Sequence, residues 1–194
     1  MLSGSGLVAV VCIGPWGSGK TALLRRYASN LDTPDHISTV NPDFIQAIFR
    51  NKQEEYEREI KQKLKSCNCC TVCMPTGTGK TNMATRIIAD EKLCTVILLT
   101  LSSLKPSWLK TLKENFPDIA DQIWLVGEND KIFKNNEGFI PPIIICMKGK
   151  INHINENIRK SIGLLIVDES HLYWNNTGVS AMLHFTPRKM LFLS

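Results

Sequence analysis

Short runs of uninterrupted apolar residues, separated by segments of helical periodicity, recur along the whole sequence. A strand with one exposed face alternates apolar and polar residues, so an uninterrupted run indicates a strand that is buried on both faces. Such strands belong to parallel sheets, in which each crossover places a helix on the sheet. The sequence therefore predicts an α/β fold with a parallel sheet between two layers of helices. The predicted strands are 7–13, 70–74, 94–101, 122–127, 141–147, 162–169 and 189–193.

A long helix is predicted over residues 41–65. Asn41 can cap its N-terminus, and Pro42 suits the first helical position, where a backbone N–H is not needed. Two helices that break near Asn51 are the alternative. The polar segment 130–138 is expected to form a surface loop.

A phosphate-binding loop, "PTGTGKT", lies between the strand predicted over 70–74 and a helix. Its glycines permit a tight turn, so backbone N–H groups can surround phosphate oxygens at the helix N-terminus. Lys80 can reach the β- and γ-phosphates of a nucleotide, and the Thr81 hydroxyl can ligate Mg²⁺. The loop residues predicted to contact the nucleotide are Thr76, Gly77, Thr78, Gly79, Lys80 and Thr81.

An acidic pair, Asp168 and Glu169, ends the apolar strand 162–169. Ligands of open parallel sheets bind at the carboxyl ends of the strands, which is where this pair falls. Asp168 would hold Mg²⁺ together with Thr81, mainly through water, and Glu169 would orient and deprotonate the attacking water. The alternative is an acidic pair placed there only by solvent exposure. The phosphate loop "PTGTGKT" matches this pair and favours catalysis, with Lys80, Asp168 and Glu169 as the catalytic residues.

The combination of "MPTGTGKT" and "VDESH" resembles motifs I and II of the superfamily 2 helicases of the DExH type. The segment "VILLTLSSLKPSWLKTLKENF" is similar to the family's motif Ia region, and "PPIIICMKGKI" resembles the strand before motif II, which ends in a turn that contacts nucleic acid. "FRNKQEEY" resembles the entry helix that carries an adenine-reading glutamine, here Gln53. The resemblance covers roughly residues 45–194 and favours the restriction-enzyme, DNA-repair and transcription-factor helicases.

This resemblance implies an N-terminal RecA-like ATP-binding domain that uses ATP and Mg²⁺ and acts on nucleic acid, with DNA favoured over RNA. His171 would couple ATP to nucleic acid; the alternative is a capping or surface histidine. Trp108 recurs with Leu104 and Leu112 at helical spacing, so we expect it to pack in the core rather than to stack on a base. The candidate contacts to the nucleic-acid backbone are Ser102, Ser103, Lys105 and Lys148, and the alternative for each lysine is ordinary solvation.

The sequence stops at "KMLFLS", where the family's third motif would begin, and it contains no second RecA-like lobe. Such a lobe supplies the arginine that stabilises the transferred phosphoryl group, and translocation depends on two lobes that close around ATP. The resemblance therefore implies that these residues alone bind ATP weakly, hydrolyse it very slowly and unwind nothing.

A second phosphate-loop pattern lies upstream, in "CIGPWGSGKTALL". It lacks a strand that ends in its own carboxylate, since Asp43 begins a predicted helix. We therefore divide the chain into a partial nucleotide- or anion-binding unit at 1–40 and a main domain at 41–194. Two alternatives stay open: a small kinase-like NTPase that uses the upstream loop, and a nucleotide-dependent interaction module without catalysis. The phosphate-binding residues of the upstream loop are Gly14, Gly17, Ser18, Gly19, Lys20 and Thr21.

Composition adds few constraints. There are 23 Lys and Arg residues against 18 Asp and Glu, and the net charge of +5 is compatible with nucleic acid without requiring it. The 7 cysteines are expected to be reduced thiols of an intracellular protein. Those in "CNCCTVC" could ligate a metal or act as small apolar residues of a buried strand, and the alternation of strand faces favours the second interpretation. No apolar run approaches the roughly 20 residues of a membrane span.

Overall fold

The computed structural model describes residues 42–74, 77–134 and 138–194. Their strands form one six-stranded sheet in the order β1-β6-β5-β2-β4-β3, and every pair in it is parallel. The strands are β1 (Cys69–Val72), β2 (Thr95–Leu99), β3 (Ile123–Leu125), β4 (Ile143–Met147), β5 (Leu164–Val167) and β6 (Lys189–Leu193).

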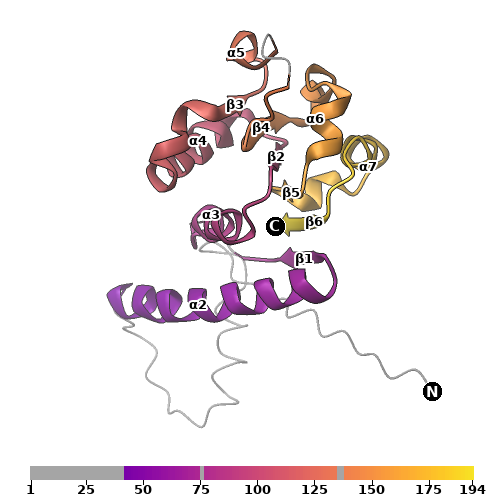
Figure 1. The fold of residues 1–194 in the computed structure, drawn as a ribbon. Helices are drawn as coiled ribbons and strands as arrows, with labels where there is room; N and C mark the ends of the chain where they lie inside the picture. The colour runs from indigo at the N-terminus through magenta and orange to yellow at the C-terminus, as the bar shows by residue number, and fades with distance from the viewer. Residues whose placement is uncertain (1–41, 75–76, 135–137) are drawn as a thin grey trace, which may run out of the picture.

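Helices cover both faces of the sheet (Figure 1). On one face lie α2 (Pro42–Ser66), α3 (Lys80–Glu91) and α4 (Lys105–Asn115), and on the other lie α6 (Glu156–Ser161) and α7 (Asn176–Leu183). This arrangement confirms the predicted RecA-like α/β fold. The shorter elements are α5 (Asp130–Lys134) and the 3-10 helices η1 (Ser102–Leu104), η2 (Pro117–Gln122), η3 (Lys148–His153) and η4 (Ser170–Tyr173).

Two separate cores lie on the two faces of the sheet. Alternate residues of β2 point in opposite directions, so Ile97 belongs to the core beneath α2, α3 and α4, whereas Val96 belongs to the core beneath α6 and α7. All five residues of β2 and all four of β5 are buried. Burial on both faces is the reason why these strands appear in the sequence as uninterrupted apolar runs.

The central strands begin and end close to the predicted positions, but β1 differs. It lies at the edge of the sheet and pairs only with β6 among the described strands. It ends at Val72, two residues before the predicted end, and only Val72 of its four residues is fully buried. The prediction of a fully buried strand is therefore wrong here, because an edge strand is covered less completely than a central one.

The structure differs from the surface loop predicted over 130–138, because Asp130–Lys134 form helix α5. Phe133 is buried and stacks on Trp124, with ring centroids 5.7 Å apart. Asp130 accepts a hydrogen bond from the Gly127 N–H through Oδ1 at 2.6 Å. A single helical turn is too short to show periodicity, so this tertiary packing leaves no signal in the sequence.

Helix α2 runs without a break past Asn51, which confirms the single long helix. The strand predicted over 7–13 and the unit predicted over 1–40 lie outside the described residues.

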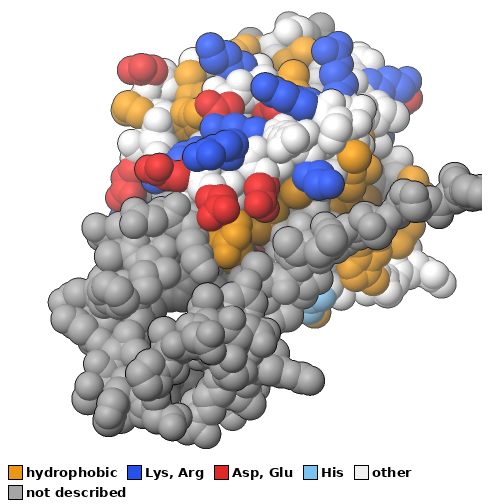
Figure 2. All heavy atoms as spheres, turned by 90° about the horizontal axis from the view of Figure 1, so that it is seen from below, with side chains coloured by type: hydrophobic (Ala, Val, Ile, Leu, Met, Phe, Trp, Pro, Cys, Tyr) orange, Lys and Arg blue, Asp and Glu red, His pale blue; other side chains and the backbone are white. Residues whose placement is uncertain are grey.

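On the face shown in Figure 2, basic and acidic side chains are interspersed rather than gathered by sign. No helix among the described residues is long and apolar enough to cross a membrane.

Two thiols should report on the integrity of this core. Burial raises the pKa of the Cys94 thiol to about 11, and that of Cys146 to about 12. Because the thiolate is the reactive form, we expect iodoacetamide at pH 8 to label both at least ~100-fold more slowly in the native protein than after unfolding. Cys67 is exposed and is the internal comparison. Peptide mass spectrometry measures the rates; labelling of Cys94 as fast as Cys67 would contradict this packing.

Candidate functional site

The phosphate loop predicted at 74–81 ends at the N-terminus of α3, which begins at Lys80. Gly77 has φ 81° and Gly79 has φ 91°, a left-handed conformation that favours glycine. Nothing lies within 4 Å of a Cβ built on Gly77, so the backbone conformation rather than crowding requires glycine there. The first N–H groups of an α-helix lack intrahelical partners and carry its positive dipole end, so this terminus suits a phosphate group.

The loop lysine and the acidic pair converge, as the motif spacing predicts. The Lys80 Nζ lies 3.7 Å from Glu169 Oε1, and the two side chains are 11% and 22% exposed. Asp168 directly follows β5, and its N–H donates to the Leu98 carbonyl at 3.1 Å, which continues the sheet pairing with β2. The sheet thus brings residues far apart in sequence to the carboxyl ends of its strands.

Asp168 is held at both carboxylate oxygens. Asp168 is only 5% exposed. The indole Nε1 of Trp108 donates to Oδ2 at 2.7 Å, and the backbone N–H of Glu169 donates to Oδ1 at 2.9 Å. Burial raises the pKa of the Asp168 carboxyl, although these two hydrogen bonds act in the opposite direction. The negative charge of Glu169 adds to the rise, and Lys80 opposes it.

Glu169 has an unusual backbone, with φ 49° and ψ 50°. A residue other than glycine in this left-handed region costs about 1–3 kcal/mol and persists only where its surroundings impose it. The hydrogen bond from its own N–H to Asp168 Oδ1 is one such constraint. Asn68 and Lys92 also have a positive φ, but Glu169 is the one of the three that directly follows the buried Asp168.

The residues that could hold Mg²⁺ are Asp168 and Thr81. Both offer hard oxygen ligands, which Mg²⁺ prefers. Each carboxylate oxygen has two lone-pair sites, so Asp168 can contact a metal or its water while it keeps both observed hydrogen bonds. Lys80 brings one positive charge to the two neighbouring carboxylates, Asp168 and Glu169. An additional cation therefore fits the charge of this site.

His171 lies between the acidic pair and the end of β6. Its Nδ1 is 3.0 Å from Ser194 Oγ and 3.5 Å from Glu169 Oε2. The backbone joins the same regions, because the Ser194 N–H donates to the Val72 carbonyl and the Met74 N–H donates to the Ser194 carbonyl. His171, which is predicted to couple ATP to nucleic acid, thus contacts both Glu169 and Ser194. Ser194 in turn is hydrogen-bonded to the residues that lead into the phosphate loop.

The four candidate nucleic-acid contacts follow two neighbouring strands. Ser102 and Ser103 are exposed in η1, which follows β2. Lys105 pairs with Glu128, with 2.7 Å between Nζ and Oε1, and its side chain is only 14% exposed. Lys148 begins η3 after β4, and its Nζ lies 5.7 Å from the centre of the Tyr173 ring. Both lysines therefore contact other side chains, and neither is simply surrounded by solvent.

Several predicted residues have no described side chain. Thr76 and the upstream loop lie outside the described residues, and Gln53 is described only by its backbone in α2. The upstream-loop residues concerned are Gly14, Gly17, Ser18, Gly19, Lys20 and Thr21.

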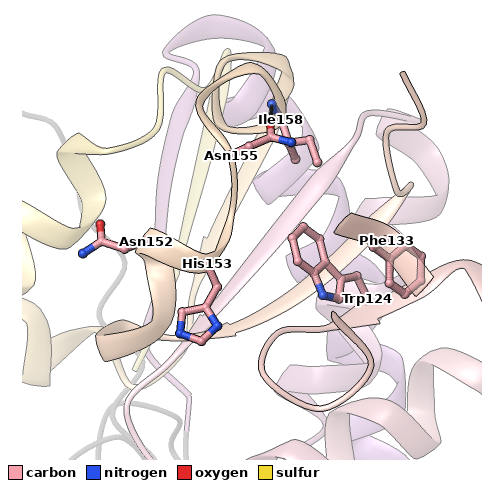
Figure 3. Close-up of a pocket in the computed structure, with 6 residues that line it drawn as sticks. All are labelled: Trp124, Phe133, Asn152, His153, Asn155 and Ile158. Carbon is pink, nitrogen blue, oxygen red and sulfur yellow. Dashed lines mark hydrogen bonds between the residues drawn. The ribbon is translucent and has the colours of Figure 1, made fainter. Parts of the chain in front are cut away.

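A separate pocket of about 370 Å³ lies near α5 and α6 (Figure 3). Its polar groups include ones with partners already: Trp124 Nε1 donates to Asp130, His153 Nδ1 lies 3.0 Å from Asp130, and Asn155 caps α6 by accepting from the Ile158 N–H. These polar groups already have partners within the fold, so we assign the pocket no ligand.

The fold and the loop define the class: this chain is a RecA-like domain of the P-loop NTPase type. It belongs to the DEAD/DEAH box helicase family, whose model matches residues 50–194. The resemblance to the N-terminal RecA-like domain of superfamily 2 helicases is thereby confirmed.

One relative is itself named as a helicase. "Putative helicase 109L" of Invertebrate iridescent virus 3 is 25% identical over 155 residues, which cover 80% of this chain and 47% of that protein. The chain thus spans about half the length of this relative.

Solved structures agree on the fold. The SWI2/SNF2 ATPase core of Sulfolobus solfataricus, in complex with dsDNA, matches with a TM-score of 0.60 and 16% identity over 74% of this chain and 31% of that one. The Hef helicase domain of Pyrococcus furiosus matches with a TM-score of 0.54 and 21% identity, covering 72% and 32%.

Proposed function

We propose that this chain is the ATP-binding lobe of a DExH-type helicase, which hydrolyses ATP with Mg²⁺ to drive movement on, or unwinding of, nucleic acid. The observation that supports this most directly is the convergence of Lys80 and Glu169, 3.7 Å apart, beside the buried Asp168. A phosphate-binding cation, a metal carboxylate and a candidate general base then share one edge of the sheet.

Each residue has a distinct role in this proposal. Lys80 and the N-terminus of α3 bind the phosphates, and Asp168 with Thr81 holds Mg²⁺, which supplies charge stabilisation to the phosphoryl group. Glu169 orients the attacking water and accepts its proton on a carboxylate oxygen. Lys80 contacts Glu169 here, so a bound γ-phosphate would compete for Lys80 and release Glu169 for the water.

Nucleic acid is the proposed partner, with DNA favoured. The structural neighbour from Sulfolobus solfataricus was solved in complex with dsDNA, which supports this preference. Ser102 and Ser103 are exposed in η1, just before α4, and can contact a phosphodiester backbone without reading bases. His171, between Glu169 and Ser194, is the proposed coupling residue.

A second RecA-like lobe is the proposed partner for catalysis, because the chain spans only about half of its curated relative. Such a lobe supplies the arginine that stabilises charge during phosphoryl transfer. These 194 residues alone are therefore proposed to bind ATP weakly and to hydrolyse it very slowly.

Lys80→Ala should weaken nucleotide binding at least ~tenfold, because hydrogen bonds to charged groups contribute about 1.5–3 kcal/mol. Lys20→Ala in the upstream loop should retain binding. Titration of a fluorescent ATP analogue with Mg²⁺ measures both.

Lys110→Ala is the matched control, since Lys110 is highly exposed and its contact to Glu114 is long, at 3.9 Å. A loss of binding in Lys20→Ala alone would overturn the assignment and support the kinase-like alternative. Hydrolysis stimulated by DNA, in a protein extended through the second lobe, then separates a helicase from an interaction module.

A further inference from the structure

Trp108 is a buried aromatic residue whose polar atom has a specific partner. Its side chain is 1% exposed and belongs to the core beneath α3 and α4. Its indole N–H points at the carboxylate of Asp168, with 2.7 Å between Nε1 and Oδ2. A hydrogen bond to an ionised acceptor is roughly twice as strong as one between neutral groups. This contact is therefore more than the filling of apolar space.

The bond completes the support of the carboxylate. Oδ1 is held by the N–H of the next residue, Glu169, whereas Oδ2 is held from a different element, α4. Removal of the indole N–H would leave Oδ2 without this donor in a site shielded from water. The carboxylate plane could then turn about the Cβ–Cγ bond, so its orientation would no longer be defined.

The helix that carries Trp108 is itself fixed in place. Leu112, one turn later, is completely buried in the same core, and Lys105 at the helix start pairs with Glu128. A rigid donor of this kind can hold a ligand in one orientation, and partners of metal ligands commonly affect metal affinity by 10- to 100-fold.

We propose that Trp108 is a positioning residue, whose indole N–H orients the Asp168 carboxylate for Mg²⁺. The inference rests on the proposed function, because it requires that Asp168 hold the metal. Trp108 contacts no substrate in this proposal and acts only through Asp168.

The chain contains a closely matched control. Trp124 is also 1% exposed, and its Nε1 donates to the Oδ1 of another aspartate, Asp130, at 3.0 Å. That pair lies beside α5, apart from the phosphate loop. Phenylalanine at either position keeps an aromatic ring and removes the N–H, so each variant loses one indole–carboxylate hydrogen bond, buried at Trp108 and part-buried at Trp124.

The test measures the Mg²⁺ concentration that half-saturates binding of a fluorescent ATP analogue to the 194-residue chain. Trp108→Phe should raise this concentration about tenfold or more. Trp124→Phe should leave it nearly unchanged, because Trp124 and Asp130 have no role in the proposed Mg²⁺ site. Nucleotide affinity without Mg²⁺ should be the same in both variants, and thermal unfolding should show similar destabilisation.

Two results would overturn the inference. An unchanged Mg²⁺ requirement in Trp108→Phe would show that the indole only packs, and an equal shift in Trp124→Phe would assign the effect to general destabilisation. If Trp108→Phe fails to fold, replacement by 3-benzothienylalanine, which has sulfur in place of the N–H, should give the same shift. A wild-type chain that binds no nucleotide at any Mg²⁺ concentration would instead contradict the proposed function itself.

Discussion

Glu169→Gln is expected to lower the rate of ATP hydrolysis by at least ~100-fold, while nucleotide affinity changes little. General-base catalysis contributes typically about 10²–10⁴-fold to a rate, and a glutamine amide cannot accept the proton of the attacking water. Glutamine has nearly the same size and meets the same backbone restriction at φ 49°, so the fold should be retained. Loss of the contact to Lys80 should affect binding only slightly, because that ion pair is long at 3.7 Å.

Single-turnover hydrolysis in a protein extended through the second lobe, with DNA present, is the appropriate measurement. Glu57→Gln is the matched control, because Glu57 also contacts a cation, Arg86, at 2.7 Å, but lies on α2. Its rate should stay close to that of the wild type, because neither Glu57 nor Arg86 has a role in the proposed chemistry. Normal hydrolysis by Glu169→Gln would mean that another group accepts the proton.

Gly178→Ala should lower the free energy of unfolding by about 2–3 kcal/mol, near the upper end for overpacked sites. A Cβ at this position would lie 2.3 Å from the Tyr173 carbonyl oxygen, with the Tyr173 Cα and C at 2.6 and 2.7 Å. These are backbone atoms and cannot rotate away. The Gly178 N–H also donates to Asn175 Oδ1 at 2.9 Å, the bond that caps α7, so displacement of the glycine would weaken that cap.

Gly149→Ala is the comparison, since a Cβ there meets no atom within 4 Å and should change stability by less than about 0.5 kcal/mol. Urea unfolding followed by circular dichroism measures both variants. Equal stabilities would show that the turn between η4 and α7 is looser than described.

Much of the fold can be predicted from the sequence because the sheet is covered on both faces. The runs 94–101, 141–147 and 162–169 contain the fully buried cores of β2, β4 and β5. The strand order cannot be predicted in this way, since nothing in the run 189–193 indicates that β6 pairs between β1 and β5. Helix α5 cannot be predicted either, because a single turn held by Asp130 and Phe133 has no periodicity.

The candidate site, like the fold, can be predicted from the sequence only in part. Spacing and residue type predict that Lys80 approaches Glu169, because both motifs fall at strand ends of one parallel sheet. The helical spacing of Trp108 correctly predicts burial but not the partner of its N–H, since periodicity defines a face and not the direction of a polar atom. The pairing of Lys105 with Glu128 depends on the path of a turn after β3, which no local pattern specifies.

The position of β6 has a consequence for the order of events during protein synthesis. β1, which leads into the phosphate loop, joins the described sheet only through β6, and Cys69 pairs with Met190. A ribosome that adds about 5–20 residues per second needs of the order of ten seconds between these two strands. Throughout that interval β1 has no β6 to pair with, so we expect the phosphate loop at residues 77–81 to gain its place beside the described sheet only after translation has passed residue 193.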